Sequence, residues 1–354
     1  MIRAAVFGAL LLSLPTGAVA QQTHVLVVTG VAGDEEHEQK FQKWATSFIE
    51  TATKKEGVPE GNIIYLSDKP EKADKRSTRQ NVEKAFTDLA ASAKPNDAVF
   101  VLLIGHGSFD GQQAAFNLPG PDLTATDYAR LLGKLSAARV AFIDTSSSSG
   151  AFLPTVSAPG RVVVTATRTG GERNETEFPE YFIDAFRDNA ADRDRNGHVS
   201  VGEAFEYART KVAQSFQQKG IILTEHATID EGLGPGGGAG TGGVGGSGGG
   251  SSSGTSGGTG NASSAAAAST APGPLATSIF LAANGGTTTL NVDTSDPAMR
   301  TLVEERSAIE QQINALRQKR ASMEPAQYDA QMEKLLTDLA LKTKAIRDLQ
   351  AKKD

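Results

Sequence analysis

The sequence predicts an α/β fold for residues 24–230, with a doubly wound and mostly parallel β-sheet. Short apolar runs rich in Val, Ile and Phe alternate with stretches of helical periodicity, which is the pattern of βαβ units. The expected strands cover residues 25–31, 62–66, 98–104, 140–143 and 161–166, and the clearest expected helices cover residues 35–54 and 78–93. About 200 residues are enough to bury one core, so we expect a single domain over residues 21–231.

Residues 1–20 are typical of a secretory signal peptide. Arg3 gives a basic start, residues 4–14 form an apolar run, and residues 18–20 (Ala-Val-Ala) form a small-residue cleavage site. The apolar run is shorter than the roughly 20 residues that a membrane helix needs. We therefore expect a secreted or periplasmic protein with no membrane insertion after removal of the signal.

The composition excludes several kinds of site. The chain has no cysteine, so it has no disulfide, no thiolate nucleophile and no Cys-ligated zinc, although an exported protein could hold disulfides. Its formal net charge of −6 arises from mixed signs without a basic patch, so we expect no nucleic-acid partner. His24, His37 and His226 are scattered and lack the spacing of zinc ligands.

The composition changes after the α/β region. Residues 232–274 consist mainly of Gly, Ser, Thr and Ala and cannot offset their ordering entropy, so a flexible linker is expected. Residues 275–300 start with an apolar run that ends at Ala283. We expect this run to be a strand or a docking segment, followed by a connector.

The last region, residues 301–354, is expected to form a helical hairpin or a dimerising coiled coil. A break at residues 322–325 separates two helical stretches, and Lys342 interrupts an otherwise regular spacing of four and three in the second. The apolar stripes are Leu302, Ile309, Ile313 and Leu316 in the first stretch, and Tyr328, Met332, Leu335, Leu339, Ile346 and Leu349 in the second. A solvated pair of charged helices is the alternative.

Two short polar motifs follow two of the expected strands. The sequence Gly-His-Gly at residues 105–107 follows the run 98–104, and the sequence Asp-Thr-Ser-Ser-Ser-Ser-Gly at residues 144–150 follows the run 140–143. Open α/β sheets build their sites at the carboxyl ends of parallel strands. A His flanked by two glycines is poorly placed for core packing, so the sequence predicts that His106 lies in a cleft.

This pair of motifs resembles the catalytic dyad of the caspase and legumain superfamily (clan CD, legumain type), with Ser in place of the catalytic Cys. The resemblance implies that His106 transfers protons, that the Gly107 N–H binds the oxyanion and that Ser147 takes the place of the nucleophile. In this family the nucleophile lies three residues before a Gly. Gly150 therefore selects Ser147, and Ser146 is the runner-up.

The resemblance covers nearly all of residues 24–230 and implies a caspase-like sheet. Residues 161–174 occupy the place of the next core strand and of a loop that helps to form the specificity pocket. In that loop, Arg168, Glu172 and Arg173 either line a pocket for a charged or amide side chain or lie in solvent.

A serine does not replace a cysteine without further requirements. A thiol is partly ionised at neutral pH, whereas a hydroxyl needs an oriented base such as a His held by a carboxylate. Asp144 lies within the second motif and Asp110 follows the first. Neither spacing shows that the carboxylate reaches the imidazole of His106.

Three alternatives follow for this exported protein. The first is a Ser-His endopeptidase or hydrolase that acts on a peptide or protein substrate. The second is an inactive pseudo-peptidase that keeps the cleft as a binding or regulatory module, and the third is a set of strand-end polar residues without chemistry. In the legumain-like plan a C-terminal helical segment caps the peptidase domain, which implies intramolecular capping by the hairpin; self-association through the hairpin is the alternative.

Residues 192–203 match the twelve-residue EF-hand loop, and a helix is expected on each side, at residues 177–188 and 203–218. Gly197 supplies the sharp turn, and we expect a structural Ca²⁺ ion. The expected ligands are Asp192, Asp194, Asn196, the His198 carbonyl, Ser200 and Glu203. A loop without an ion is the alternative, because no second loop is visible to pair with this one.

Overall fold

The structure is a computed structural model that describes residues 21–95, 97–135, 139–188, 190–232, 271–283, 296–318 and 323–350. The expected signal peptide and residues 233–270 of the expected linker lie outside these residues, as does Ser322 at the expected helix break. Within the described part of the chain, none of the helices has the length and apolar character needed to cross a membrane.

A six-stranded sheet with the order β2-β1-β3-β7-β8-β9 forms the centre of the α/β domain. Its strands are β1 (Thr23–Thr29), β2 (Ile63–Leu66), β3 (Ala98–Ile104), β7 (Arg139–Asp144), β8 (Arg161–Thr165) and β9 (Thr228–Asp230). β9 is antiparallel to β8, and the other pairs are parallel. The prediction of an α/β fold with a mostly parallel sheet is confirmed.

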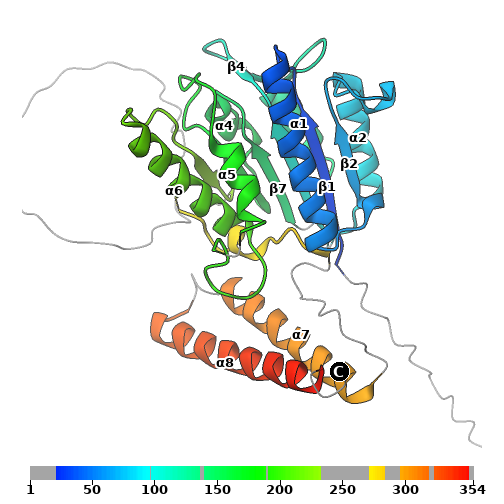
Figure 1. The fold of residues 1–354 in the computed structure, drawn as a ribbon, viewed down its shortest axis with the longest axis vertical. Coiled ribbons are helices and arrows are strands. Elements are labelled where there is room, and N and C mark those ends of the chain that lie inside the picture. Colours follow the sequence, from blue (N-terminus) through cyan, green and yellow to red (C-terminus); the bar gives the residue numbers. More distant parts are fainter. Residues whose placement is uncertain are drawn as a thin grey trace, which may run out of the picture.

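Helices cover both faces of this sheet (Figure 1). One layer contains α1 (Glu35–Glu50), α5 (Phe178–Ala185) and α6 (Val201–Lys219), and the other contains α2 (Arg79–Ser92), α3 (Ala125–Leu132) and α4 (Leu153–Val156). In β1, Val25 and Val27 pack into the first layer, whereas Leu26 and Val28 pack into the second. A strand that is buried on both faces has no polar side, which explains the continuous apolar runs of the sequence.

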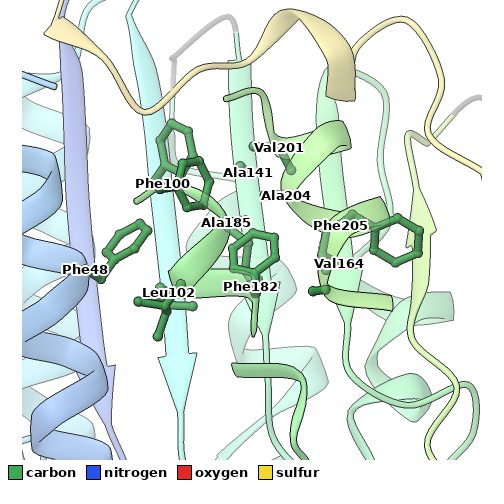
Figure 2. Close-up of a cluster of buried hydrophobic side chains, with 14 of the residues drawn as sticks. Phe48, Phe100, Leu102, Ala141, Val164, Phe182, Ala185, Val201, Ala204 and Phe205 are labelled. Atoms are coloured by element: carbon green, nitrogen blue, oxygen red, sulfur yellow. The ribbon is translucent and has the colours of Figure 1, made fainter. Parts of the chain in front are cut away.

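Figure 2 shows part of the core between the sheet and the first layer, where Phe side chains pack among smaller aliphatic side chains. Phe48 of α1, Phe182 of α5 and Phe205 of α6 are fully buried above the sheet, together with Phe100 of β3. Short helical segments complete the domain: η1 (Thr51–Lys55) continues α1 as a π-helix, and η2 (Glu60–Asn62), η3 (Ala73–Lys75) and η4 (Ser149–Phe152) are 3₁₀ turns.

A second, three-stranded antiparallel sheet follows β3 directly. It contains β4 (Gly107–Phe109), β5 (Ala114–Phe116) and β6 (Leu123–Thr124). This sheet was not expected from the sequence, because strands of two or three residues are too short to show a period of two. Since β4 begins at Gly107, the small sheet fixes the backbone directly after His106.

The two C-terminal helices, α7 (Pro297–Gln318) and α8 (Pro325–Gln350), pack against each other as a hairpin. Of the expected stripes, Ile313, Leu316, Leu339 and Ile346 are buried. Arg306 donates from Nε to Thr343 Oγ1 across the hairpin at 3.1 Å. A coiled coil between two copies of the chain stays a prediction.

Candidate functional site

The two polar motifs lie side by side because β3 and β7 are neighbouring parallel strands. Leu103 of β3 pairs with Asp144 of β7, and the Thr145 N–H donates to the Leu103 carbonyl at 3.1 Å. Both strands end at this level, so the chain leaves each of them at the same edge of the sheet. His106 and Ser147 both line one small cavity at this edge.

This cavity is small and lies between α1, α5 and the two strand ends. Besides His106 and Ser147, its walls include Phe41 and Trp44 of α1 and Glu175. Its volume of about 10 Å³ is enough for roughly one water molecule. The cavity as it stands therefore has no room for a peptide.

The imidazole of His106 faces α1. Its Nε2 lies 3.2 Å from the Ala32 carbonyl oxygen, and its ring makes edge contacts with His37 and Phe41 at centroid distances of 5.1 and 5.3 Å. Among the described residues, no hydrogen bond joins this imidazole to Ser147. His106 therefore does not orient the hydroxyl of Ser147 in this arrangement.

The hydroxyl of Ser147 is held by the backbone of Gly107. Ser147 Oγ donates to the Gly107 carbonyl at 3.2 Å and accepts from the Gly107 N–H at 3.4 Å. Ser147 is only 7% exposed. The N–H that the family resemblance assigns to the oxyanion thus already contacts the hydroxyl assigned to the nucleophile.

Ser146, the runner-up nucleophile, is fully buried and bound to Asp144. Its Oγ donates to Asp144 Oδ1 at 2.6 Å and its N–H donates to the same oxygen at 3.0 Å. Burial raises the pKa of Asp144 to about 6, and the two hydrogen bonds from Ser146 oppose this shift in part. Asp144 Oδ2 is buried without a hydrogen-bond partner.

The other carboxylate close in sequence, Asp110, is not part of this cavity. Its Oδ1 accepts from the N–H groups of Gln112 and Gln113 at 2.8 and 2.7 Å, and these bonds lower the pKa of Asp110. Asp110 therefore stabilises the turn between β4 and β5.

The remaining serines of the run serve the turn itself. Ser148 adopts a left-handed conformation with φ 59°, which is uncommon for a residue with a side chain, and its N–H donates to the Glu172 carbonyl at 2.8 Å. Ser149 Oγ lies 3.2 Å from Thr167 Oγ1. The local strain at Ser148 is thus stabilised by a loop that comes from after β8.

The structure also places beside His106 a charged cluster that was not expected from the sequence. His37 bonds through Nδ1 to Asp34 at 2.8 Å and through Nε2 to Glu175 at 3.3 Å, and Lys40 also pairs with Glu175. The hydrogen bond to Asp34 raises the pKa of His37. Asp34 also caps α1. A capping Asp three residues before a His is the sequence signal that could have predicted this contact.

The three loop residues expected near a specificity pocket do not gather in the cavity. Glu172 accepts from the Arg168 N–H at 3.2 Å and lies 3.1 Å from His226 Nδ1. Arg173 donates to the Phe109 carbonyl at 3.2 Å. These contacts join the loop after β8 to the end of β4 and to the segment before β9.

Residues 192–203 form a compact loop after α5 and the first turn of α6. The carboxylates of Asp192, Asp194 and Glu203 each offer an oxygen within 4.8 Å of the others. Arg195 and Gly197 have positive φ values of 55° and 91°, which bend the loop around these oxygens. These three carboxylates are therefore the group that could hold a metal ion in this loop.

The other expected ligands of the loop have local roles. Asn196 Oδ1 accepts from the His198 N–H at 2.9 Å, and the His198 ring bonds to Glu56 at 3.0 Å, which leaves the His198 carbonyl as its candidate ligand atom. Ser200 Oγ donates to Glu203 Oε2 at 2.8 Å and caps α6, so this helix begins at Val201, two residues earlier than expected. α5 ends at Ala185, three residues earlier than expected.

No family model matches the chain, and no curated protein matches it.

Proposed function

We propose that this chain is an exported, caspase/legumain-like pseudo-peptidase whose α/β domain serves as a binding or regulatory module for a peptide or protein. The observation that carries this proposal is the hydrogen bonding of the two dyad positions. Ser147 Oγ is paired with the Gly107 backbone, and His106 Nε2 is paired with the Ala32 carbonyl. The caspase-like ancestry rests on the sequence motifs at the ends of β3 and β7.

Acyl transfer to serine needs a base that takes the hydroxyl proton during attack and an unoccupied oxyanion donor. For His106 to act as this base, its ring would have to turn from Ala32 toward Ser147. For the Gly107 N–H to bind an oxyanion, the Ser147 hydroxyl would have to leave it. A third requirement is space, since the cavity holds about 10 Å³.

A Ser-His hydrolase is the second candidate, and one observation favours it. His106 and Ser147 line the same cavity, so an acid-base group and a nucleophilic group share one site. Catalytic hydrogen bonds are often long in the absence of substrate. An experiment on the hydroxyl separates the two candidates.

We expect the mature protein to give no more labelling with a fluorophosphonate probe than its Ser147→Ala variant, because no base activates the hydroxyl. The measurement is in-gel fluorescence, with a known serine hydrolase in the same sample as the positive control. Strong labelling of the wild type that both Ser147→Ala and His106→Ala abolish would contradict the pseudo-peptidase proposal and establish the hydrolase.

Binding has its own readout in Trp44, the single tryptophan of the chain, which lines the cavity. Peptides that open the cavity should change the emission of Trp44, and His106→Ala should weaken this response. A wild-type protein without any response to a mixed peptide library would contradict the binding function.

We also propose that Asp192, Asp194 and Glu203 bind a structural Ca²⁺ ion, with Asn196, Ser200 and the His198 carbonyl as further oxygen donors. Their oxygen chemistry and their positions in the loop support this. The ion would supply positive charge that offsets the repulsion of the carboxylates, and the loop residues would hold α5 and α6 together.

Saturating Ca²⁺ is expected to raise the melting temperature, because an ion that binds only the folded state at a hundredfold excess over Kd stabilises it by roughly 2.7 kcal/mol. Glu203→Gln should remove most of this shift while it keeps the helix cap. Glu206→Gln on the same helix is the matched control and should keep the full shift. Equal melting temperatures of the wild type in Ca²⁺ and in a chelator would contradict the calcium site.

A further inference from the structure

The segment after the Gly/Ser-rich region packs deeply into the α/β domain. Residues 271–283, which we call the clasp, include a 3₁₀ turn, η5 (Ala276–Ser278), and a bridge from Phe280 to Ser200. Ala276, Ile279 and Leu281 belong to the same core as α1, α5 and α6, and each is at most 1% exposed.

Hydrogen bonds tie the clasp to several separate parts of the domain. The Val201 N–H donates to the Ile279 carbonyl at 2.9 Å, and the Ala283 N–H donates to the Glu56 carbonyl at 2.9 Å. Thr23 Oγ1 donates to the Ala282 carbonyl at 2.5 Å, and Arg139 donates to the Ser278 carbonyl at 3.2 Å. The backbone of the clasp is thus satisfied by partners from β1, β7, α6 and the end of η1.

Glu231 brings the two ends of the Gly/Ser-rich region together. Its carboxylate is 7% exposed and accepts from the N–H groups of Leu275 and Ala276 at 3.1 and 2.8 Å. Gly273 lies so close to Glu231 that a Cβ there would be 2.4 Å from Glu231 Oε2. Since the chain leaves and re-enters the domain at one place, the intervening residues 233–270 need not hold the two parts in position.

We propose that the clasp holds the C-terminal hairpin on the α/β domain without help from residues 233–270, so that the protein stays assembled as two chains when that region is cut. The apolar burial and the hydrogen bonds of the clasp supply the attachment. A protease that cuts residues 233–270 would therefore change the covalent structure but leave the assembly intact.

The position of the clasp also decides where the hairpin is attached. Thr23 and Arg139 are the first residues of β1 and β7, so the clasp lies at the amino ends of the strands. His106 and Ser147 lie at the opposite edge of the sheet. Figure 1 shows α7 and α8 on the side of the clasp, so the hairpin lies away from the cavity and not over it.

The test uses the mature, full-length protein with two engineered protease sites, one within residues 233–270 and one, for a different protease, within residues 284–295. After the first cut, we expect both fragments to elute together in size-exclusion chromatography at low micromolar concentration. After the second cut alone, we expect the hairpin to elute separately. Separation after the first cut, or a hairpin that stays bound after the second, would overturn the proposal.

A second test measures how fast the C-terminal fragment exchanges. In the protein cut within residues 233–270, Ile279→Ala should speed the exchange of a fluorescently labelled C-terminal fragment at least tenfold, because it removes buried contacts of the clasp. Ile222→Ala is the matched control, since Ile222 is 86% exposed, and it should leave the exchange rate unchanged. Circular dichroism of the uncut variants verifies that both are folded. Equal exchange rates for the folded Ile279→Ala variant and the wild type would also overturn the proposal.

Discussion

Replacement of Gly107 by Ala is expected to lower the free energy of unfolding by roughly 3 kcal/mol or more. A Cβ at this position would lie 2.3 Å from the Ser147 carbonyl oxygen and 2.5 Å from Ser146 Oγ. Neither neighbouring atom can move at low energetic cost, because one is backbone and the other is a fully buried hydroxyl bound to Asp144. Overpacking of this kind typically costs 1–3 kcal/mol, and backbone contact places this site at the upper end of that range or above it.

Urea unfolding followed by circular dichroism measures this effect. Gly61→Ala is the control, because a methyl group added at Gly61 would meet no atom within 4 Å and the φ of Gly61 is not positive. It should change the free energy of unfolding by less than about 0.5 kcal/mol. Similar stabilities for the two variants would show that the ends of β3 and β7 are not packed as closely as described, and the account of Ser147 would lose its basis.

The strands of the central sheet could be predicted because their burial is visible in the sequence. β3 is apolar at every position and β1 has a continuous apolar run from Val25 to Val28, and each strand is covered by helices on both faces. The gathering of Asp192, Asp194 and Glu203 in residues 192–203 could also be predicted, since it depends on local spacing alone. Patterns of this kind need no knowledge of distant contacts.

The arrangement inside the cavity could not be predicted in the same way. The motifs placed His106 and Ser147 at adjacent strand ends, but the direction of the imidazole depends on the Ala32 carbonyl and on the ring of His37. Both come from the start of the chain. Likewise, the conformation of Ser148 depends on the Glu172 carbonyl, which arrives from the loop after β8.

The clasp illustrates the same limit of prediction from sequence. The sequence marked residues 275–283 as apolar and as a candidate docking segment, yet its partners are Thr23, Glu56, Arg139 and Val201. These residues are far apart in sequence and share no motif. Hydrophobicity predicts that a segment is buried, whereas the groove that receives it is made by the complete fold.

Asp144→Asn is expected to remove a pH dependence of stability that the wild type shows between about pH 4 and pH 8. Burial raises the pKa of Asp144 from 3.8 to about 6 in the folded protein. The protonated carboxyl therefore favours folding below the unfolded pKa, and this contribution is lost as the pH rises through about 6. A rise of this size in the pKa corresponds to roughly 3 kcal/mol.

Asparagine suits this site because the two hydrogen bonds from Ser146 go to one oxygen of Asp144, while the other oxygen has none. The amide keeps one acceptor and carries no charge at any pH. We expect the stability of the variant relative to the wild type to increase by roughly 3 kcal/mol from pH 4 to pH 8. Urea unfolding at several pH values gives both curves.

Two comparisons make this result specific. Burial also raises the pKa of Glu225 to about 7, and this carboxyl gives a loss of stability with the same sign in both proteins, so the difference between the two curves isolates Asp144. Asp88→Asn removes an exposed carboxylate of α2 that pairs with Lys84 but keeps Asp144, so this control should keep the loss of stability that the wild type shows as the pH rises. If the Asp144→Asn curve instead runs parallel to that of the wild type, the pKa of Asp144 is the same in the folded and the unfolded protein, and the burial described for the end of β7 is wrong.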